Sequence, residues 1–100
     1  MLHYCIYTFV WDESKNRSNR RKHGVSFESA ARVFDDREAI SYRDRVTDGE
    51  ERWPTIGLVG GVVILLVVHT NEERNGKEEI RIISARKASA RERAAYDSDH

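Results

Sequence analysis

The chain has 100 residues and a mass of 11.6 kDa, so we expect a single domain over residues 1–100. Its longest apolar run, Val62 to Val68, has seven residues, far short of the ~20 that a membrane-spanning helix requires. The N-terminus lacks the basic and apolar regions of a secretory signal, and the one cysteine cannot form an internal disulfide. These features predict a cytoplasmic protein with no membrane partner.

Charge is balanced overall, with 17 basic and 17 acidic residues, but it is divided into blocks along the chain. Lys15 to Gly24 contains five Lys or Arg and no acid, residues 35–52 carry a net charge of −3, and residues 81–93 carry +4. The basic blocks predict an anionic partner, and the acidic block predicts a basic one. The alternative interpretation is an ordinary solvated surface of mixed charge.

The first predicted elements are a strand and a wholly polar helix. Tyr4 to Trp11 is rich in aromatic and β-branched residues, which favour a strand, and we expect Cys5 within it to be inert packing. Asp12 is a suitable N-cap for a helix that runs to His23, and Gly24 is a suitable stop. None of these helical positions is apolar, so the helix must dock through polar side chains.

One stripe of this polar helix has the spacing to face inward. Asn16, Asn19 and His23 lie at i, i+3 and i+7, and we expect them to hydrogen-bond to the rest of the fold. On its own, His23 also suits a helix C-terminus, where the macrodipole favours it. The arginines that this arrangement turns outward are Arg17, Arg20 and Arg21.

A second helix is predicted from an N-cap at Ser26 to about Phe34. Unlike the first helix, it has apolar residues at the helical period, so it can pack against a core. Those residues are Phe27, Ala30, Ala31 and Phe34.

The second half of the chain is typical of an antiparallel meander. Gly60-Gly61 and Asn75-Gly76 are residue pairs that favour tight hairpin turns. The unbroken apolar run from Val62 to Val68 predicts a central strand buried on both faces. The predicted strands cover residues 39–43, 51–59, 62–68 and 79–86.

The chain ends in a third predicted helix. Ser89 and Glu92 form a capping box at its start, and the helix carries Tyr96, which on its own is typical of a core aromatic. The predicted fold class is therefore α+β, an antiparallel β-sheet meander with two helices in the N-terminal half and one C-terminal helix.

Basic residues are the strongest candidates for a functional site. The four histidines are scattered and the cysteine is alone, so we expect no metal site. Arg81 interrupts an apolar strand, so it either pairs with a carboxylate such as Glu51 or points into an open concavity. Arg86 and Lys87 follow at the junction with the last helix, where they either bind a phosphate or are ordinary surface charge.

Two segments closely resemble the BrnT family of toxins. The first is Trp11 to Glu28, and the second is Arg81 to Ala88 with the following Glu92 and Tyr96. The resemblance implies a RelE-like fold, a ribonuclease that arrests translation, and no cofactor. It also implies neutralisation by a BrnA-like antitoxin with a ribbon-helix-helix DNA-binding domain. Toxin and antitoxin together would bind operator DNA and repress their own operon.

The chemistry that the resemblance implies requires three kinds of side chain. Metal-independent RNA cleavage uses the substrate's own 2′-hydroxyl, so the protein must supply a base, cations for the phosphorane, and a proton donor for the 5′-oxygen. We predict that Arg81 and Arg86 stabilise the phosphorane. The candidates for proton transfer, among which the sequence does not decide, are Glu51, His23 and Tyr96, with His69 as a further one. The predicted RNA-binding residues are Lys22, Arg52, Lys87, Arg20 and Arg21.

A different class of function is also consistent with the sequence. In this alternative the chain is a non-catalytic module that contacts antitoxin, DNA or RNA through its basic helix. Cleavage of a long RNA by the purified protein in EDTA would favour the enzyme, and intact RNA at high protein excess would favour the module.

Overall fold

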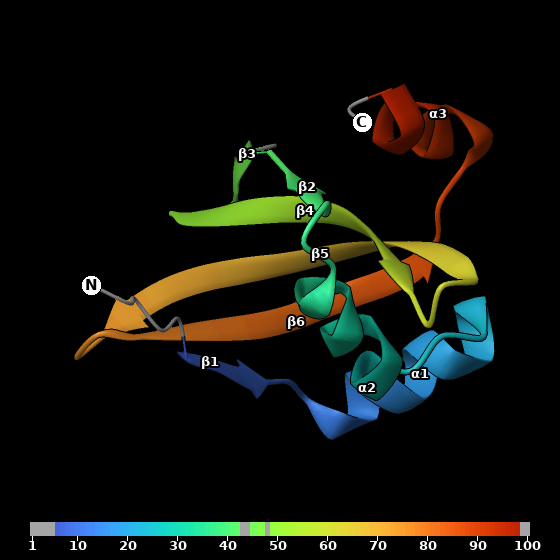
Figure 1. Cartoon of the computed structure of the whole chain (residues 1–100). Helices are drawn as coiled ribbons and strands as arrows, with labels where there is room; N and C mark the ends of the chain where they lie inside the picture. Colours follow the sequence, from blue (N-terminus) through green and yellow to red (C-terminus); the bar gives the residue numbers. More distant parts are fainter. Residues whose placement is uncertain (1–5, 43–44, 48, 99–100) are drawn as a thin grey trace.

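Two successive hairpins form the centre of a β-sheet in the computed structural model, which describes residues 6–42, 45–47 and 49–98 (Figure 1). The strand order is β1-β6-β5-β4-β2, and the short strand β3 pairs with β4. The strands are β1 (Ile6–Val10), β2 (Ile40–Ser41), β3 (Arg45–Thr47), β4 (Glu50–Val59), β5 (Val63–Arg74) and β6 (Lys77–Lys87). The helices are α1 (Glu13–His23), α2 (Phe27–Ala31), the 3₁₀ helix η1 (Arg32–Asp35) and α3 (Ala90–Ser98).

Both predicted hairpin turns are confirmed. Gly60 and Gly61 join β4 to β5 with φ of 63° and 69°, and Asn75 and Gly76 join β5 to β6 with φ of 52° and 76°. Two successive positive φ values match the right-handed twist of the flanking strands, and Gly and Asn adopt them most readily. Strands β4, β5 and β6 therefore form the predicted antiparallel meander.

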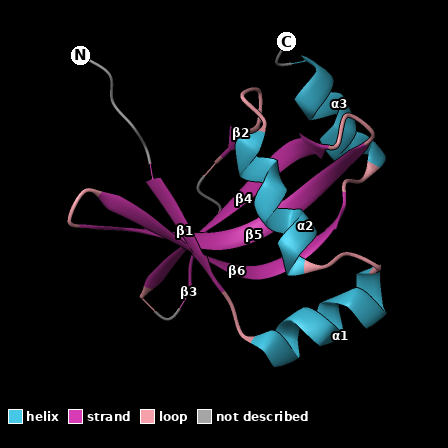
Figure 2. Cartoon of the chain, turned by 60° about the horizontal axis from the view of Figure 1, so that its bottom comes forward, coloured by secondary structure: helices cyan, strands magenta, loops and turns pink. Residues whose placement is uncertain are grey.

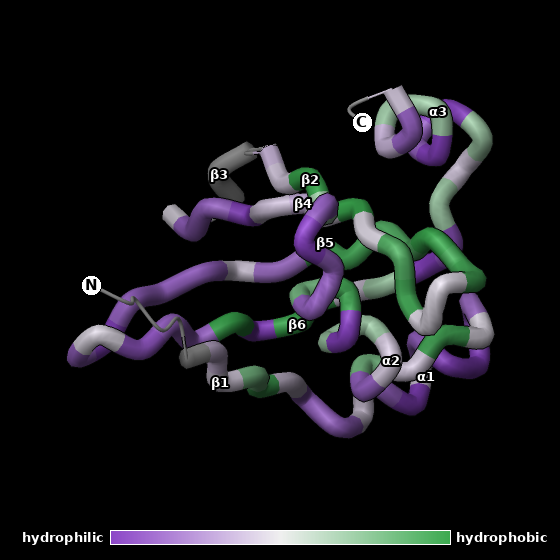
Figure 3. The backbone as a smooth tube through the Cα atoms, viewed as in Figure 1, coloured by the Kyte–Doolittle hydropathy of each residue, from purple (hydrophilic) through white to green (hydrophobic). Residues whose placement is uncertain are grey.

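Two features of the sheet differ from the prediction. Strand β1 joins the edge of β6 in parallel rather than antiparallel pairing, because α1 and α2 carry the chain away before the meander begins. The hairpin of β5 and β6 is also longer than its apolar core, since pairing continues through charged residues to Arg74 opposite Lys77. Figure 3 shows this arm as hydrophilic and the other end of β5 as hydrophobic.

The central strand is buried on both faces in its middle, as predicted, whereas Val63, Ile64 and Val68 are only partly buried. Leu65, Leu66 and Val67 are buried, whereas Val62 lies in the glycine turn and is 86% exposed. Leu65 and Val67 pack with Phe27 and other residues of α2 and η1 on one face. The opposite face carries a smaller cluster made by Ile56, Leu66 and Tyr96 of α3.

The three α-helices contact the sheet in different places. Helix α2 lies across one face, α1 lies beside the edge, and α3 lies apart from both (Figure 2). Helix η1 packs directly on β4 at Gly57. The approach is so close that a Cβ at this position would lie 2.7 Å from Val33 Cγ1. We call the face that carries Ile56, Leu66 and Tyr96 the open face, since α2 and η1 cover the other one.

The polar helix α1 docks through asparagines, as its sequence predicts. Asn16 and Asn19 are only 1% and 7% exposed. The Asn19 carboxamide donates to Ala85 O at 2.7 Å and accepts from Ala85 N at 3.2 Å, as a neighbouring strand would. Asn16 Oδ1 accepts from the backbone of Phe27 at 2.8 Å, which ties α1 to the start of α2.

The expectation that His23 also faces inward is wrong. His23 is exposed in the last turn of α1, and the buried residue beyond Gly24 is the apolar Val25. Asn19 Nδ2 donates to Val25 O at 2.8 Å, so polar anchoring of the helix ends one turn earlier than the stripe predicted. None of the described helices has the length and hydropathy to span a membrane. Cys5, for which inert packing is predicted, lies outside the described residues.

Candidate functional site

A cavity of about 260 Å³ lies on the open face, where β1 ends and α1 begins. Three of its side chains are cations and one is the acidic N-cap of α1. We call it the cationic cavity; it is lined by Asp12, Lys15, Arg52, Arg81, Ile82 and Ile83.

Strand pairing explains why two arginines from distant parts of the sequence meet here. Trp53 pairs with His69 on β5, so Arg52, one residue earlier on β4, comes beside Thr70. Thr70 in turn pairs with Arg81 on β6. Side chains that are opposite one another in a sheet share a face, so Arg52 and Arg81 flank Thr70 on the open face.

A β-bulge brings Arg86 to the same face. Val68 pairs with Ser84 but the next residue, His69, pairs with Ile82, so Ile83 is an extra residue in β6. Arg81 and Arg86 are five residues apart and would face opposite ways in a regular strand. The bulge reverses the alternation, so both arginines lie on the open face.

Arg52 is the most unusual of the cations in the cavity. Its side chain is half-buried, and its Nε atom is buried without a hydrogen-bond acceptor among the described residues. Arg52 also lines the cavity together with Arg81 and Lys15, so three positive charges are gathered around one space. The cavity therefore has the chemistry of an anion site.

Arg81 combines the two possibilities that its sequence position left open. Its Nη2 atom bonds Glu50 Oε1 at 2.5 Å, while the same guanidinium lines the cationic cavity. The carboxylate is thus Glu50 rather than the neighbouring Glu51. Residues next to each other on a strand face opposite ways, so Glu51 points away from the face that carries Arg52 and Arg81.

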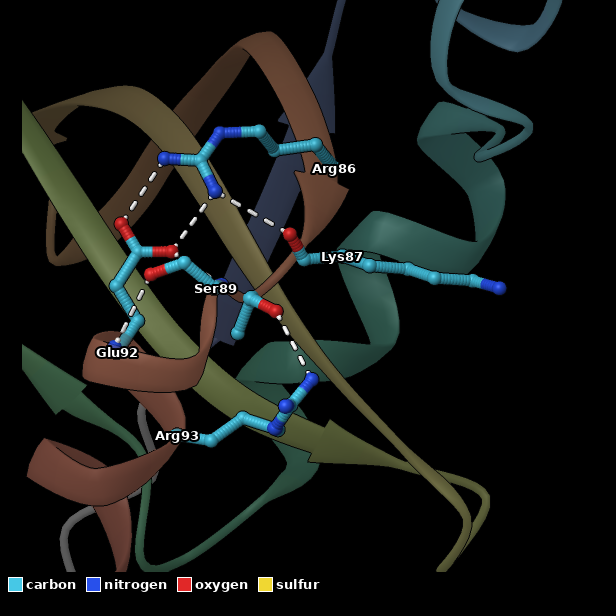
Figure 4. Close-up of polar contacts among 6 residues, drawn as sticks. Arg86, Lys87, Ser89, Glu92 and Arg93 are labelled. Carbon is cyan, nitrogen blue, oxygen red and sulfur yellow. Dashed lines mark hydrogen bonds and ion pairs between the residues drawn. The ribbon is translucent and has the colours of Figure 1, made fainter.

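Arg86 is engaged by the last helix. Its Nη1 and Nη2 atoms donate to the two carboxylate oxygens of Glu92 at 2.8 and 2.9 Å, and Nη1 also donates to Lys87 O at 3.2 Å (Figure 4). Glu92 accepts from Ser89 N at 2.8 Å, and Glu92 N donates to Ser89 Oγ at 3.2 Å, which confirms the capping box. The hydrogen bonds from Arg86 lower the pKa of Glu92 to about 2. Arg86 therefore holds α3 in place.

Tyr96 anchors the same helix from its other end. It is buried against Ile56 and Leu66, and its hydroxyl donates to Asp36 Oδ2 at 2.6 Å. The same carboxylate oxygen accepts from Leu58 N at 2.8 Å. The hydrogen bond to Asp36 raises the pKa of Tyr96 to about 12, so this hydroxyl is a poor proton donor at neutral pH.

The remaining predicted residues lie on exposed surfaces. Arg20, Arg21, Lys22 and His23 are exposed in the last turns of α1, away from the N-terminal turn that borders the cationic cavity. Arg20 and Arg21 line, with Arg17, a shallow depression of about 380 Å³. Lys87 is exposed, and Figure 4 shows its side chain extending away from the pair of Arg86 and Glu92.

Sequence reasoning missed two members of this region. Lys15 lies in the first turn of α1, and its place beside the cavity follows from the turn between β1 and α1. Alternation along β4 puts Glu50 rather than Glu51 on the face of Arg52, but only the pairing of β4, β5 and β6 shows that this face also carries Arg81. In the part of the chain that the structure describes, no three His, Cys, Asp or Glu side chains are grouped as metal ligands would be.

A mixed β-sheet with a cationic cavity on its open face, beside the polar helix α1, defines a small α+β protein with a candidate anion site. A family described as the ribonuclease toxin BrnT of type II toxin–antitoxin systems matches residues 11–92. The chain belongs to this family of ribonuclease toxins, whose type implies an antitoxin partner and an RNA target.

A solved structure supports the same fold. The chain is similar to the crystal structure of the Brucella abortus ribonuclease toxin BrnT, with a TM-score of 0.63 and 24% identity. The match covers 84% of this chain and 97% of the Brucella protein. It confirms the α+β fold with three helices. No curated protein matches the chain in a comparison of sequences.

Proposed function

We propose that the chain is a metal-independent endoribonuclease that holds the scissile phosphate in the cationic cavity. The observation that carries this proposal is that Arg52 and Arg81, which come from different strands, line the same cavity together with Lys15. Two guanidinium groups on the same face of the sheet, on either side of Thr70, offer several N–H donors to one phosphate. Lys15 adds a third positive charge from α1.

The reaction follows from the substrate's own chemistry. The 2′-hydroxyl oxygen attacks the adjacent phosphorus, and the bond from phosphorus to the 5′-oxygen breaks. The leaving 5′-oxygen takes a proton from water, so the products are a 2′,3′-cyclic phosphate and a free 5′-hydroxyl. Charge on the phosphorane is highest between these two events, and Arg52 and Arg81 stabilise it because they are held in position beforehand. The bond from Glu50 fixes Arg81 for this task.

Glu50 is the carboxylate best placed to accept the proton of the 2′-hydroxyl. It shares the open face with Arg52 and Arg81 and contacts Arg81 directly. Glu51, one of the candidates for proton transfer that the sequence offers, faces the other way. A matched pair of variants, Glu50→Gln and Glu51→Gln, separates these two assignments. Cleavage should fall in the first variant and remain near wild type in the second.

Helix α1 supplies a path for the rest of the RNA chain. Lys15 borders the cavity, and Arg17, Arg20 and Arg21 continue along the outer surface of the same helix. Together with Lys22 and Lys87, these exposed cations are suited to the phosphates that flank the cleaved bond. Arg86 has a different task in this proposal, since its bonds to Glu92 position the end of β6 and the start of α3.

The antitoxin is proposed to be a BrnA-like protein with a ribbon-helix-helix domain that binds operator DNA. An acidic segment of such a partner would neutralise the toxin by occupying the cationic cavity. Opposite charges steer the encounter, so the association rate should fall steeply with added salt. The complex of toxin and antitoxin would then repress its own operon.

The test is incubation of purified protein with a long RNA in EDTA. We expect cleavage to 2′,3′-cyclic phosphate ends, and we expect Arg52→Ala to lower the rate by roughly 10²–10³ without loss of fold. Arg74→Ala is the control, because Arg74 pairs with Glu72 on the exposed hairpin arm. Intact RNA in the presence of folded wild-type protein would favour the non-catalytic binding module, and inhibition by EDTA would overturn metal independence.

A further inference from the structure

A second cavity, of about 200 Å³, lies on the face of the sheet opposite the cationic cavity. Its walls are mostly aromatic, and its polar groups are neutral or acidic. We call it the aromatic cavity; its lining residues include Tyr7, Phe34, Trp53, Ser41, His69 and Glu78. It combines apolar walls with a few polar groups, the arrangement typical of small-molecule and base-binding sites.

Two polar side chains that line this cavity, His69 and Ser41, are linked through the buried hydroxyl of Thr55. His69 is buried, and its Nδ1 atom bonds the Thr70 carbonyl at 3.1 Å, so the hydrogen lies on Nδ1. Nε2 therefore accepts from the Thr55 hydroxyl at 2.6 Å, and the Thr55 oxygen accepts from the Ser41 hydroxyl at 2.6 Å. The Ser41 oxygen is left as an acceptor at the exposed rim.

The aromatic residues have the placement of a stacking site. Phe34 packs edge-on against His69 with ring centroids 4.8 Å apart, and Tyr7 is tilted against Phe34 at 6.1 Å. Tyr7 is 41% exposed, so its ring reaches the opening of the cavity. Trp53 completes the walls from β4. Planar bases of single-stranded RNA bind to protein by stacking on such rings.

The acidic group at this cavity determines what it can hold. Glu78 is half-buried, and no cation pairs with it in the part of the chain that the structure describes. A carboxylate repels a phosphate, so the cavity is unsuited to the RNA backbone. It is a pure acceptor, so it binds groups that present adjacent N–H donors.

We propose that the aromatic cavity binds a guanine base of the RNA substrate. Guanine presents two neighbouring donors, N1–H and the 2-amino group, on its Watson–Crick edge, and these match the two oxygens of Glu78. Adenine, cytosine and uracil each place a ring nitrogen or carbonyl acceptor beside their donor, which would face the carboxylate unfavourably.

The two cavities are connected through consecutive residues of β6. Ile80 lines the aromatic cavity and Arg81 lines the cationic one, so a nucleotide chain that passes over the edge near β1 reaches both. The inference rests on the proposed ribonuclease function and adds the base that sets cleavage preference. The binding itself depends on a different set of residues.

The first experiment measures guanosine binding by the fluorescence of Trp53. A nucleoside has no phosphate, so it does not require the cationic cavity. We expect saturable quenching by guanosine. The affinity for adenosine, cytidine and uridine should be lower than that for guanosine by roughly tenfold or more. Trp53→Phe identifies the signal, because Trp11 packs against Phe27 elsewhere in the fold. Glu78→Gln should lose the preference, and Glu79→Gln on the next position should retain it.

The second experiment sequences the cleavage ends produced from a random RNA. Wild-type protein should cut at a fixed distance from guanine, and Glu78→Gln should cut with little base preference. Guanosine binding by wild type and by Arg52→Ala, without any RNA cleavage, would support the cavity and overturn the proposed ribonuclease function. Cleavage that is indifferent to guanine, with no quenching by guanosine, would overturn the inference and leave the ribonuclease function standing.

Discussion

The two ends of the open face use their arginines differently. Beside α1, Arg52 and Arg81 line a cavity, and one of their N–H groups has no acceptor among the described residues. Beside α3, both terminal nitrogens of Arg86 are bonded to Glu92. The same residue type on the same face is thus available for a ligand at one end and committed to the fold at the other.

The attachment of the two helices explains this difference. Helix α1 is held by uncharged amides, so docking it uses none of its cations. Helix α3 is held by Tyr96 and by the ionic contact between Arg86 and Glu92. A basic helix that docks through asparagines keeps its positive charge for a partner.

The largest expected effect, on the cleavage rate, comes from replacing one arginine at each end of the open face by alanine. Arg81→Ala should lower the cleavage rate by roughly 10²–10³, because it removes a preorganised donor from the phosphorane. Its melting temperature should change little, since Arg81 and Glu50 form a half-exposed pair worth about 0–1 kcal/mol. Arg86→Ala should show the reverse pattern, with a lower melting temperature and a smaller loss of rate. Equal losses of rate in two stable variants would remove the distinction between the ends.

The next effect tests the amides that hold α1. Asn19→Ala should lower the free energy of unfolding by about 1–3 kcal/mol, because both backbone groups of Ala85 lose their partner in a buried place. Chemical denaturation measures this change. Ser18→Ala, on the exposed side of the same helix, is the control and should stay within about 0.5 kcal/mol of wild type. An unchanged Asn19→Ala protein would mean that α1 is held in some other way.

The docking of α1 could be predicted in large part from the sequence. A helix without apolar residues must dock through polar ones, and periodicity singled out Asn16 and Asn19. The same periodicity failed at His23, because the helix ends there and Val25 supplies the next buried side chain. Local rules thus identified the helix, its caps and its anchors but not the path of the chain beyond them.

The candidate site was harder to predict because it depends on register. Alternation along β6 places Arg81 and Arg86 on opposite faces, and only the extra residue Ile83 brings them together. The pairing of β4 with β5 determines that Glu50, rather than Glu51, reaches Arg81. The residue types predict neither the bulge nor the register. The sequence therefore indicated which kinds of side chain form the site but not which of them lie together.

A smaller effect is expected from the ionic contact at α3. The pKa of Glu92 is about 2, below its ordinary value of 4.5, so ionised Glu92 stabilises the folded state above about pH 4.5. That stabilisation should disappear as the pH falls from there toward 2. With Glu92 20% exposed and Arg86 41% exposed, we expect it to amount to about 1–2 kcal/mol.

Melting temperatures of wild type and Glu92→Gln, measured across this pH range, isolate the contribution of Glu92 from that of other carboxylates. The difference between the two proteins should be largest near neutral pH and should vanish near pH 2. A constant difference would show that Glu92 acts through its capping hydrogen bonds rather than through its charge.

The smallest effect concerns a single cation on the outer surface of α1. Arg20 is exposed and lines the shallow depression with Arg17 and Arg21, so we expect it to contact one RNA phosphate. Each phosphate contact with a single strand contributes about 0.7 to the slope of log affinity against log salt, so Arg20→Ala should make that slope shallower by about this amount. Arg93 is the matched control, because it lies on α3 and donates to Ala88 O at 3.3 Å. Fluorescence anisotropy of a short RNA over a range of salt concentrations measures both variants. A shallower slope for Arg93→Ala and an unchanged one for Arg20→Ala would reverse the assignment and place the RNA across α3, because the slope reports which cations release counterions on binding.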